Sequence, residues 1–293
     1  MELTEIWKRF TDRMAEIELF HRAAKDSAQN ELKEIQEYAN LLEENSALKE
    51  LSSSLHNMMF YDARTGLARF YHHQKRSIEE RVLDVLLHKN KQYQWLLAEA
   101  YEEFEDYLEN VYAYCGIVDK ALWPLQDYGN ISLMELPQKD FPWFAEQAGK
   151  KKRIPYSILK KFRIWFPQLE SIEVSNKFNV NLRLAITLIE KLRHIIVHRG
   201  GKVANKSRFV QVVTEACGLF NNGNISQEHL GFITSFFGKD VYTNVILLLE
   251  IRIHPEVPID IHVSLFEKLT GYLMAYAFLI FEEVDSHQSK KNA

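Results

Sequence analysis

Apolar side chains recur at steps of three and four residues through long stretches of this sequence, and this spacing constrains the fold more than any other feature. Examples are Ile6, Phe10, Met14 and Ile17, followed by Leu32, Ile35, Ala39 and Leu42. Residues at these steps share one face of an α-helix. The pattern predicts long amphipathic helices, at about 3–51, 67–87, 91–117, 179–198, 226–237, 240–253 and 260–285. We expect an all-α fold with almost no strand, although Arg208 to Val213 could form a short strand or helix.

Five of the seven prolines lie between Pro124 and Pro167. Proline removes a backbone donor and disrupts a helix interior, so long helices are not expected in this part of the chain. The same part is rich in Trp and Phe, which favour burial over solvation. We predict an irregular, packed connection that contains one short helix near 157–165.

Composition argues against several classes of protein. The most apolar stretch, Val263 to Phe281, contains Glu267 and Lys268 and falls short of the ~20 apolar residues that cross a membrane. The only two cysteines, Cys115 and Cys217, have no CxxC spacing, so neither a disulfide framework nor a zinc cluster is expected. These features predict a protein of the reducing cytoplasm that does not enter a membrane. We also expect no cofactor.

Positive charge is concentrated in one fifth of the chain. Residues 150–208 hold 15 Lys and Arg against three Asp and Glu, whereas residues 1–149 hold 16 against 27. Such a basic segment is typical of a surface that binds a polyanion such as RNA. The alternative is a basic face that balances the acidic N-terminal half across a contact. The candidate contacts to an RNA backbone are Lys150, Lys151, Lys152, Arg153, Lys160, Lys161, Arg199 and Lys202.

The sequence EKLRHIIVHRGG, from Glu190 to Gly201, ends the predicted helix at 179–198 and contains the strongest candidates for catalytic residues. On an ideal helix Arg193 falls within the apolar arc, while Glu190, His194 and His198 share the polar side. A guanidinium that points toward a core or an interface must find an anion, because an unpaired buried charge is costly.

Three interpretations of this helix end compete. Cations near a helix C-terminus gain about 0.3–1 kcal/mol from the helix dipole, which explains the charges but not the position of Arg193. Glu190, His194 and His198 step by four residues and could offer ligands to a metal, although no HExxH motif is present. Finally, a histidine could move a proton while an arginine holds a phosphoryl oxygen.

The residues Arg193, His194 and His198 in RHIIVHRGG resemble the RxxxxH signature of the HEPN superfamily. His194 occupies the polar second position, where Asn or Asp is more common. The segment AEAYEEFEDYLENVYA at 98–113 is similar to the first core helix of many HEPN domains, and the basic residues at 150–163 precede the motif helix as in that family. The resemblance covers about residues 91–285 and implies a HEPN-like helical bundle there. From the helical spacing we expect an N-terminal helical extension over 1–90, and from the polar composition a flexible tail over 286–293.

The resemblance implies a metal-independent endoribonuclease of a defence or toxin type, with a homodimer and an antitoxin or other regulatory protein as partners. His198 then serves as general acid or base, Arg193 stabilises the pentacoordinate phosphate, His194 supports them, and cleavage leaves a 2′,3′-cyclic phosphate. Arg193 and His198 lie about 140° apart on one helix, so they would meet on one phosphate only across a two-fold axis. The other function class is a non-catalytic all-α RNA-binding or protein-interaction module.

Overall fold

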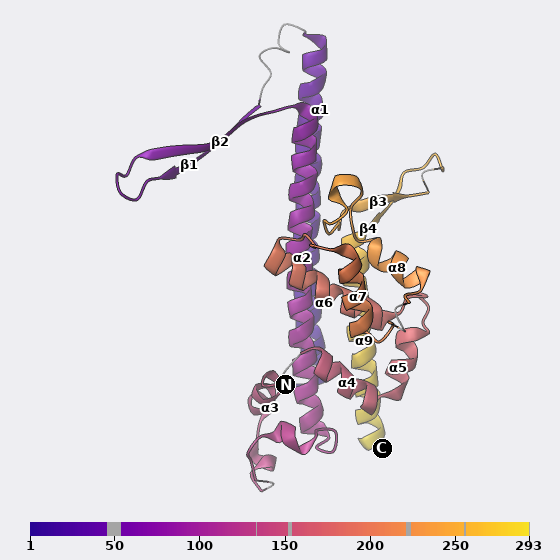
Figure 1. The fold of residues 1–293 in the computed structure, drawn as a ribbon. Helices are drawn as coiled ribbons and strands as arrows, with labels where there is room; N and C mark the ends of the chain where they lie inside the picture. Colours follow the sequence, from indigo (N-terminus) through magenta and orange to yellow (C-terminus); the bar gives the residue numbers. More distant parts are fainter. Residues whose placement is uncertain (46–53, 133, 152–153, 221–223, 255, 293) are drawn as a thin grey trace. The chain divides into compact units, whose positions relative to one another are not determined.

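The computed structural model describes residues 1–45, 54–132, 134–151, 154–220, 224–254 and 256–292 (Figure 1). It is mostly helical, which confirms the expected helical character, and it also contains two small antiparallel sheets. The helices are α1 (Leu3–Glu44), α2 (Ile78–Val118), α3 (Phe141–Gly149), α4 (Tyr156–Trp165), α5 (Pro167–Val174), α6 (Leu182–Arg199), α7 (Lys206–Ala216), α8 (Gln227–Thr234) and α9 (Leu265–Asn292). The strands are β1 (Ser54–Tyr61), β2 (Ala68–Arg76), β3 (Glu250–Ile253) and β4 (Ile261–Ser264). Short 3-10 helices are Leu125–Tyr128, Leu136–Gln138 and Asp240–Tyr242.

The chain divides into two compact units. Unit 1 consists of residues 1–19 and 93–293, and unit 2 consists of residues 20–92. Because the boundaries fall inside α1 and α2, each of these long helices contributes to both units. The predicted short helix near 157–165 is confirmed as α4, and the ambiguous segment at 208–213 is helical and lies in α7.

Unit 2 combines a two-helix contact with a β-hairpin. Ala28, Leu32 and Ile35 of α1 pack with Ile78, Val82 and Val85 of α2, and each set repeats at steps of four and three residues. Strands β1 and β2 pair antiparallel, with Met59 opposite Phe70. The helix predicted over 67–87 is therefore wrong at 68–76, and the expectation of almost no strand is wrong there as well.

The turn at 62–67 explains this hairpin. The amide of Gly66 donates to the carbonyl of Asp62 over 2.8 Å, and the amide of Asp62 donates to the carbonyl of Leu67 over 2.9 Å. Gly66 has a φ of 66°, a conformation that favours glycine. This closed turn places β2, with its β-favouring Phe70 and Tyr71, beside β1, so the backbone donors of 68–76 pair across strands.

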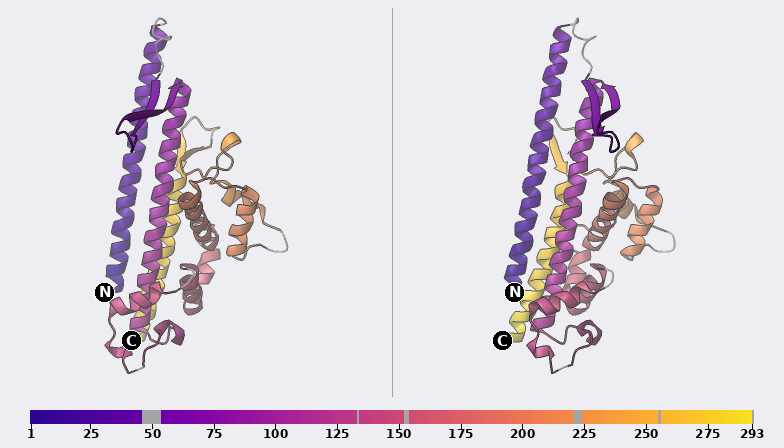
Figure 2. Two further views of the ribbon diagram at one scale, coloured as in Figure 1. Left: turned by 60° about the vertical axis from the view of Figure 1, so that its left-hand side comes forward. Right: turned by 90° about the vertical axis from the view of Figure 1, so that its left-hand side faces the viewer.

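An aromatic core joins the start of α1, the second half of α2 and α9 in unit 1. Figure 2 shows these three segments side by side, with both chain termini at the same end of the unit. The ring of Trp7 lies 6.0 Å from Tyr107 and 5.5 Å from both Phe278 and Phe281, between centroids. Phe10 in turn lies 6.4 Å from Phe104. A later residue of α1 therefore meets an earlier residue of α2, so these two segments run antiparallel.

A buried carboxylate ties four helices of unit 1 together. Glu173 of α5 is fully buried. Its oxygens accept hydrogen bonds from Nε of Arg163 on α4 over 2.8 Å and from Nε of Arg183 on α6 over 3.0 Å. The hydroxyl of Tyr276 on α9 also donates to Glu173. Burial of a charge is tolerated here because both the charge and the lone pairs of Glu173 are satisfied.

The end of unit 1 differs from the sequence expectation in three places. The helix predicted over 260–285 begins only at Leu265, because residues 261–264 pair with β3 as strand β4. The helix predicted over 240–253 is wrong: the amide of Ile246 donates to Gly201 and the amide of Val203 donates to Asn244, so the segment bonds to the end of α6 and not to its own preceding turn. The segment expected as a flexible tail is helical as far as Asn292. There Asp119 pairs with His287 and Lys291, at 3.0 Å and 2.8 Å, and hydrogen bonds from Lys291 and His287 lower the pKa of Asp119 to about 2.

Within the described residues, no helix has both the length and the apolar character that a membrane crossing requires. Cys115 and Cys217 are free and buried, and burial raises the pKa of both thiols. They behave as small core residues, as the sequence predicts.

Candidate functional site: the exposed histidine face of α6

Helix α6 begins and ends close to where the sequence predicts. Asn181 caps its first turn by accepting a hydrogen bond from the amide of Leu184 over 2.9 Å. At the other end Gly200 adopts a left-handed conformation with φ 61°, and its amide donates to the carbonyl of Ile195. Apolar residues bury one side of the helix, which leaves its polar side for chemistry.

Gly201 fixes the position of this helix end. It is buried with a φ of 81°, and a Cβ added there would lie 2.1 Å from Oε1 of Gln94. The side-chain amide of Gln94 donates to the carbonyl of Ile246 over 2.8 Å, and the carbonyl of Gly201 accepts from the amide of Ile246 over 2.9 Å. The second glycine of the motif therefore allows α2 and the segment around Ile246 to approach α6 closely.

Arg193 finds its anion within the same chain. Its Nη2 lies 2.6 Å from Oε1 of Glu102 on α2. Burial raises the pKa of the neighbouring Glu105 to about 7, with Arg193 acting in the opposite direction and Glu190 and Glu102 reinforcing the rise. The inference that Arg193 needs an anion is therefore met by the acidic face of α2.

His194 and His198 lie together on the exposed polar side of α6. Their ring centroids are 4.6 Å apart, and both side chains are exposed. Partial desolvation lowers the pKa of His194, and the neighbouring His198, Lys191 and Arg199 lower it further. A histidine with a lowered pKa is mostly neutral at pH 7 and can accept a proton.

Glu190 does not complete a metal site with these histidines. It pairs with Lys191, and its charge raises the pKa of Tyr101 and Glu105 on the side of α2. Across the part of the chain that the structure describes, Glu190, His194 and His198 do not bring three ligand atoms close to one another. The spacing of four residues therefore does not bring Glu190, His194 and His198 together as metal ligands.

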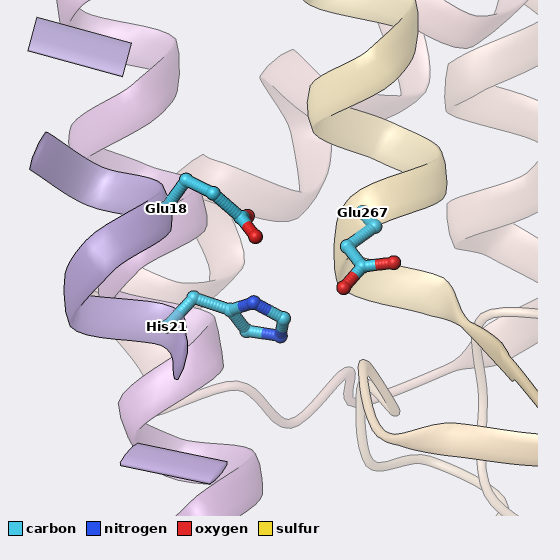
Figure 3. Close-up of side chains that lie close together, drawn as sticks. All are labelled: Glu18, His21 and Glu267. Atoms are coloured by element: carbon cyan, nitrogen blue, oxygen red, sulfur yellow. The ribbon is translucent and has the colours of Figure 1, made fainter. Parts of the chain in front are cut away.

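Elsewhere in unit 1, one carboxylate of α1 and one of α9 lie near each other. Figure 3 shows Glu18 of α1 and Glu267 of α9 with their carboxylates on facing sides of the two helices. The third side chain drawn there, His21, belongs to unit 2. Two carboxylates alone fall short of the four ligands of a structural zinc site.

A pocket of about 260 Å³ opens beside His194, between α6 and α7. Its wall is apolar and includes Ile195, Val203, Phe209 and Val212. Its polar lining consists of Lys191, His194, Arg199, Asn205 and Arg208, and none of its described lining residues is a carboxylate. Such a pocket can hold a flat apolar group while its rim holds an anion. The sequence shows Lys191 and Arg208 within the basic segment, but only the fold brings them to His194.

The larger pocket, of about 490 Å³, has a mixed charge. It is lined by the cations Lys160, Arg163 and Arg183 and by the carboxylates Glu170, Glu190 and Glu215. Because both signs are present and Arg163 and Arg183 already bind Glu173, this pocket offers less attraction to an anion than the pocket beside His194.

The structure places the predicted RNA contacts in different surroundings. Lys150 and Lys151 have internal partners, Glu146 at 2.6 Å and Asp127 at 2.5 Å, and the side chain of Lys151 is nearly buried. Arg199 and Lys202 are exposed at the end of α6, and Arg199 lines the pocket beside His194. Lys160 is exposed and Lys161 half-buried on α4, whereas Lys152 and Arg153 lie outside the described residues.

Comparison of the chain with protein-family models, with curated proteins and with solved structures gave no match. The resemblance to the HEPN superfamily therefore stands on the motif and on the helix pattern alone.

Proposed function

We propose that this chain binds RNA on the exposed histidine face of α6 and cleaves it without a metal ion, as an endoribonuclease of HEPN type. The observation that carries the proposal is the pair of imidazoles, 4.6 Å apart, with cations around them and an apolar pocket beside them. A phosphodiester is the substrate that uses all three features: the cations attract the phosphate, the histidines move protons, and the pocket receives a base.

The chemistry needs one neutral and one protonated histidine. Neutral His194 accepts the proton of a ribose 2′-hydroxyl, whose oxygen then forms a bond to phosphorus. Protonated His198 donates its proton to the 5′-oxygen as the bond from phosphorus to that oxygen breaks. The products are a 2′,3′-cyclic phosphate and a 5′-hydroxyl. The guanidinium of Arg199 stabilises the charge that builds on the phosphate, since charge-assisted hydrogen bonds strengthen there.

Arg193 takes a different part from the one the motif implies. Its ion pair with Glu102 occupies its guanidinium, so in this proposal it is a positioning residue and does not touch the phosphate. The homodimer, the antitoxin and the cytoplasmic defence role belong to the same proposal, and they follow from the resemblance. Formation of a dimer would place two histidine faces around one RNA strand.

The second candidate function is a protein-interaction module without catalysis. The pairs of Arg193 with Glu102 and Lys151 with Asp127 favour it, since both join the basic segment to acidic residues within unit 1. In that case the basic segment serves internal packing, and the exposed cations near His198 bind an acidic protein.

The test compares cleavage of a labelled RNA by the chain and by three variants. His194→Ala and His198→Ala are each expected to lower kcat by about 10²- to 10⁴-fold, the usual contribution of a general acid or base. His262→Ala is the matched control, because His262 is exposed on β4. EDTA should leave the rate unchanged, and mass spectrometry should find the cyclic phosphate. Equal rates for His198→Ala and His262→Ala, or no cleavage by any of the proteins, would favour the interaction module.

A further inference from the structure

The β-hairpin of unit 2, labelled β1 and β2 in Figure 1, presents large apolar side chains to solvent on both of its faces. From residue 57 to residue 75 every side chain except Asp62 is exposed. Met58, Met59, Phe60, Tyr61, Phe70 and Tyr71 are between 46% and 67% exposed. A contiguous exposed group of this kind is typical of a binding surface.

The strand register distributes the aromatic rings over the two faces. Met58 lies opposite Tyr71 and Phe60 opposite Arg69, so these four share one face. Met59 lies opposite Phe70 and Tyr61 opposite Ala68, on the other face. The rings of Phe60 and Tyr71 meet edge to face, with centroids 6.1 Å apart, so each ring keeps a flat side open. Each face of the hairpin therefore carries two rings among its exposed side chains.

The same hairpin is basic. Residues 54–76 contain Arg64, Arg69, Lys75 and Arg76 and a single carboxylate, that of Asp62, together with three histidines. Asp62 belongs to the turn, where its Oδ1 accepts from the amide of Arg64 over 2.9 Å. The strands thus combine open rings with cations, of which Arg69 also lies 3.5 Å from Asp62 and Arg76 3.5 Å from Asp84 of α2.

The aromatic rings and cations of the hairpin together indicate which kind of partner it binds. Two copies of the hairpin would bring cations against cations, so its charge disfavours a second copy of this surface. Single-stranded nucleic acid supplies what the hairpin lacks, because its bases stack on aromatic rings and its phosphates contact Lys and Arg. We propose that residues 54–76 form a binding arm for single-stranded nucleic acid, separate from the histidine face of α6. A duplex does not fit this arm, since its bases are already stacked on one another.

The test measures binding of fluorescein-labelled oligouridine by anisotropy, with the DNA counterpart and a blunt RNA duplex as further probes. All proteins are full chains that carry His198→Ala, so that cleavage does not consume the probe. Phe70→Ala and Phe60→Ala are each expected to weaken single-strand binding by about five- to 150-fold, the range measured for a lost stacking ring. Phe20→Ala is the matched control, because Phe20 is 63% exposed on α1 in the same unit. Phe70→Trp should restore binding, since it restores a ring.

Charge provides a second readout. Lys75→Gln should reduce the slope of log affinity against log salt by about 0.7, the value for one phosphate of a single strand. Affinities of Phe70→Ala and Phe60→Ala within twofold of the control, or equal binding of duplex and single strand, would overturn the proposal. So would a change from dimer to monomer in sedimentation of Phe70→Ala, since the hairpin would then bind a second copy. Cleavage of a dinucleotide such as UpA by Phe70→Ala in the chain that retains His198 tests the α6 site separately and should be unchanged.

Discussion

Glu173 and Glu170 lie on the same helix and bind the same arginine, but only Glu173 is buried. Arg183 Nη2 lies 2.9 Å from a carboxylate oxygen of each, while the side chains of Glu170 and Glu173 are 60% and 0% exposed. Glu173→Gln keeps the shape and one acceptor oxygen but removes the charge that Arg163 and Arg183 share. Breaking a buried pair costs about 3–5 kcal/mol, and the remaining acceptor places the expected loss near the lower end, at about 3 kcal/mol. Glu170→Gln should cost only about 0.2–1 kcal/mol, as exposed pairs do.

Urea unfolding followed by circular dichroism measures both variants against the unsubstituted chain. The midpoint should fall clearly for Glu173→Gln at an unchanged slope, and it should hardly move for Glu170→Gln. Equal losses for the two variants would refute the reasoning, because burial would then not decide the strength of the pair. A loss below about 1 kcal/mol for Glu173→Gln would refute it as well, since it would mean that α4, α5, α6 and α9 are held together without this carboxylate.

Two further predictions concern α6. Gly201→Ala should cost about 2–4 kcal/mol, from a left-handed backbone and from the collision of its Cβ with buried Gln94. Gly200→Ala should cost about 1 kcal/mol, from the left-handed backbone at an exposed position. Equal losses in urea unfolding would contradict this. Lys191→Gln should raise the pKa of His194 toward the ordinary value of about 6.5, because it removes a cation that disfavours the protonated ring. An NMR titration measures this directly, and a pKa that falls or stays in place would contradict the assigned cause.

The sequence predicts local features well where a periodic apolar face coincides with capping residues. The boundaries of α6 follow from Asn181 and Gly200, and those of α4 from the prolines on either side. The hairpin at 54–76 escaped prediction because its exposed residues show no buried face from which a period could be read. The segment at 240–253 failed for another reason: its backbone bonds to the end of α6, which no local pattern encodes.

The candidate site shows the same limit. His194 and His198 could be placed on one face from their spacing, and the structure brings their rings together. The partner of Arg193, Glu102, lies 91 residues away in the sequence, so spacing carries no information about it. The pocket beside His194 depends on how α7 packs against α6, and Arg208 enters it only through that packing.

The core around Trp7 has a consequence for the order in which the protein folds. Trp7 packs against Phe278 and Phe281, so the first helix and the last helix complete the same core. During synthesis this core cannot close until α9 has left the ribosome, while the contacts within residues 20–92 are available much earlier. Contacts so distant in sequence form slowly, and a nascent chain exposes apolar surface until they do. With the other four tryptophans replaced by Phe, Trp7 fluorescence would therefore report the closing of this core.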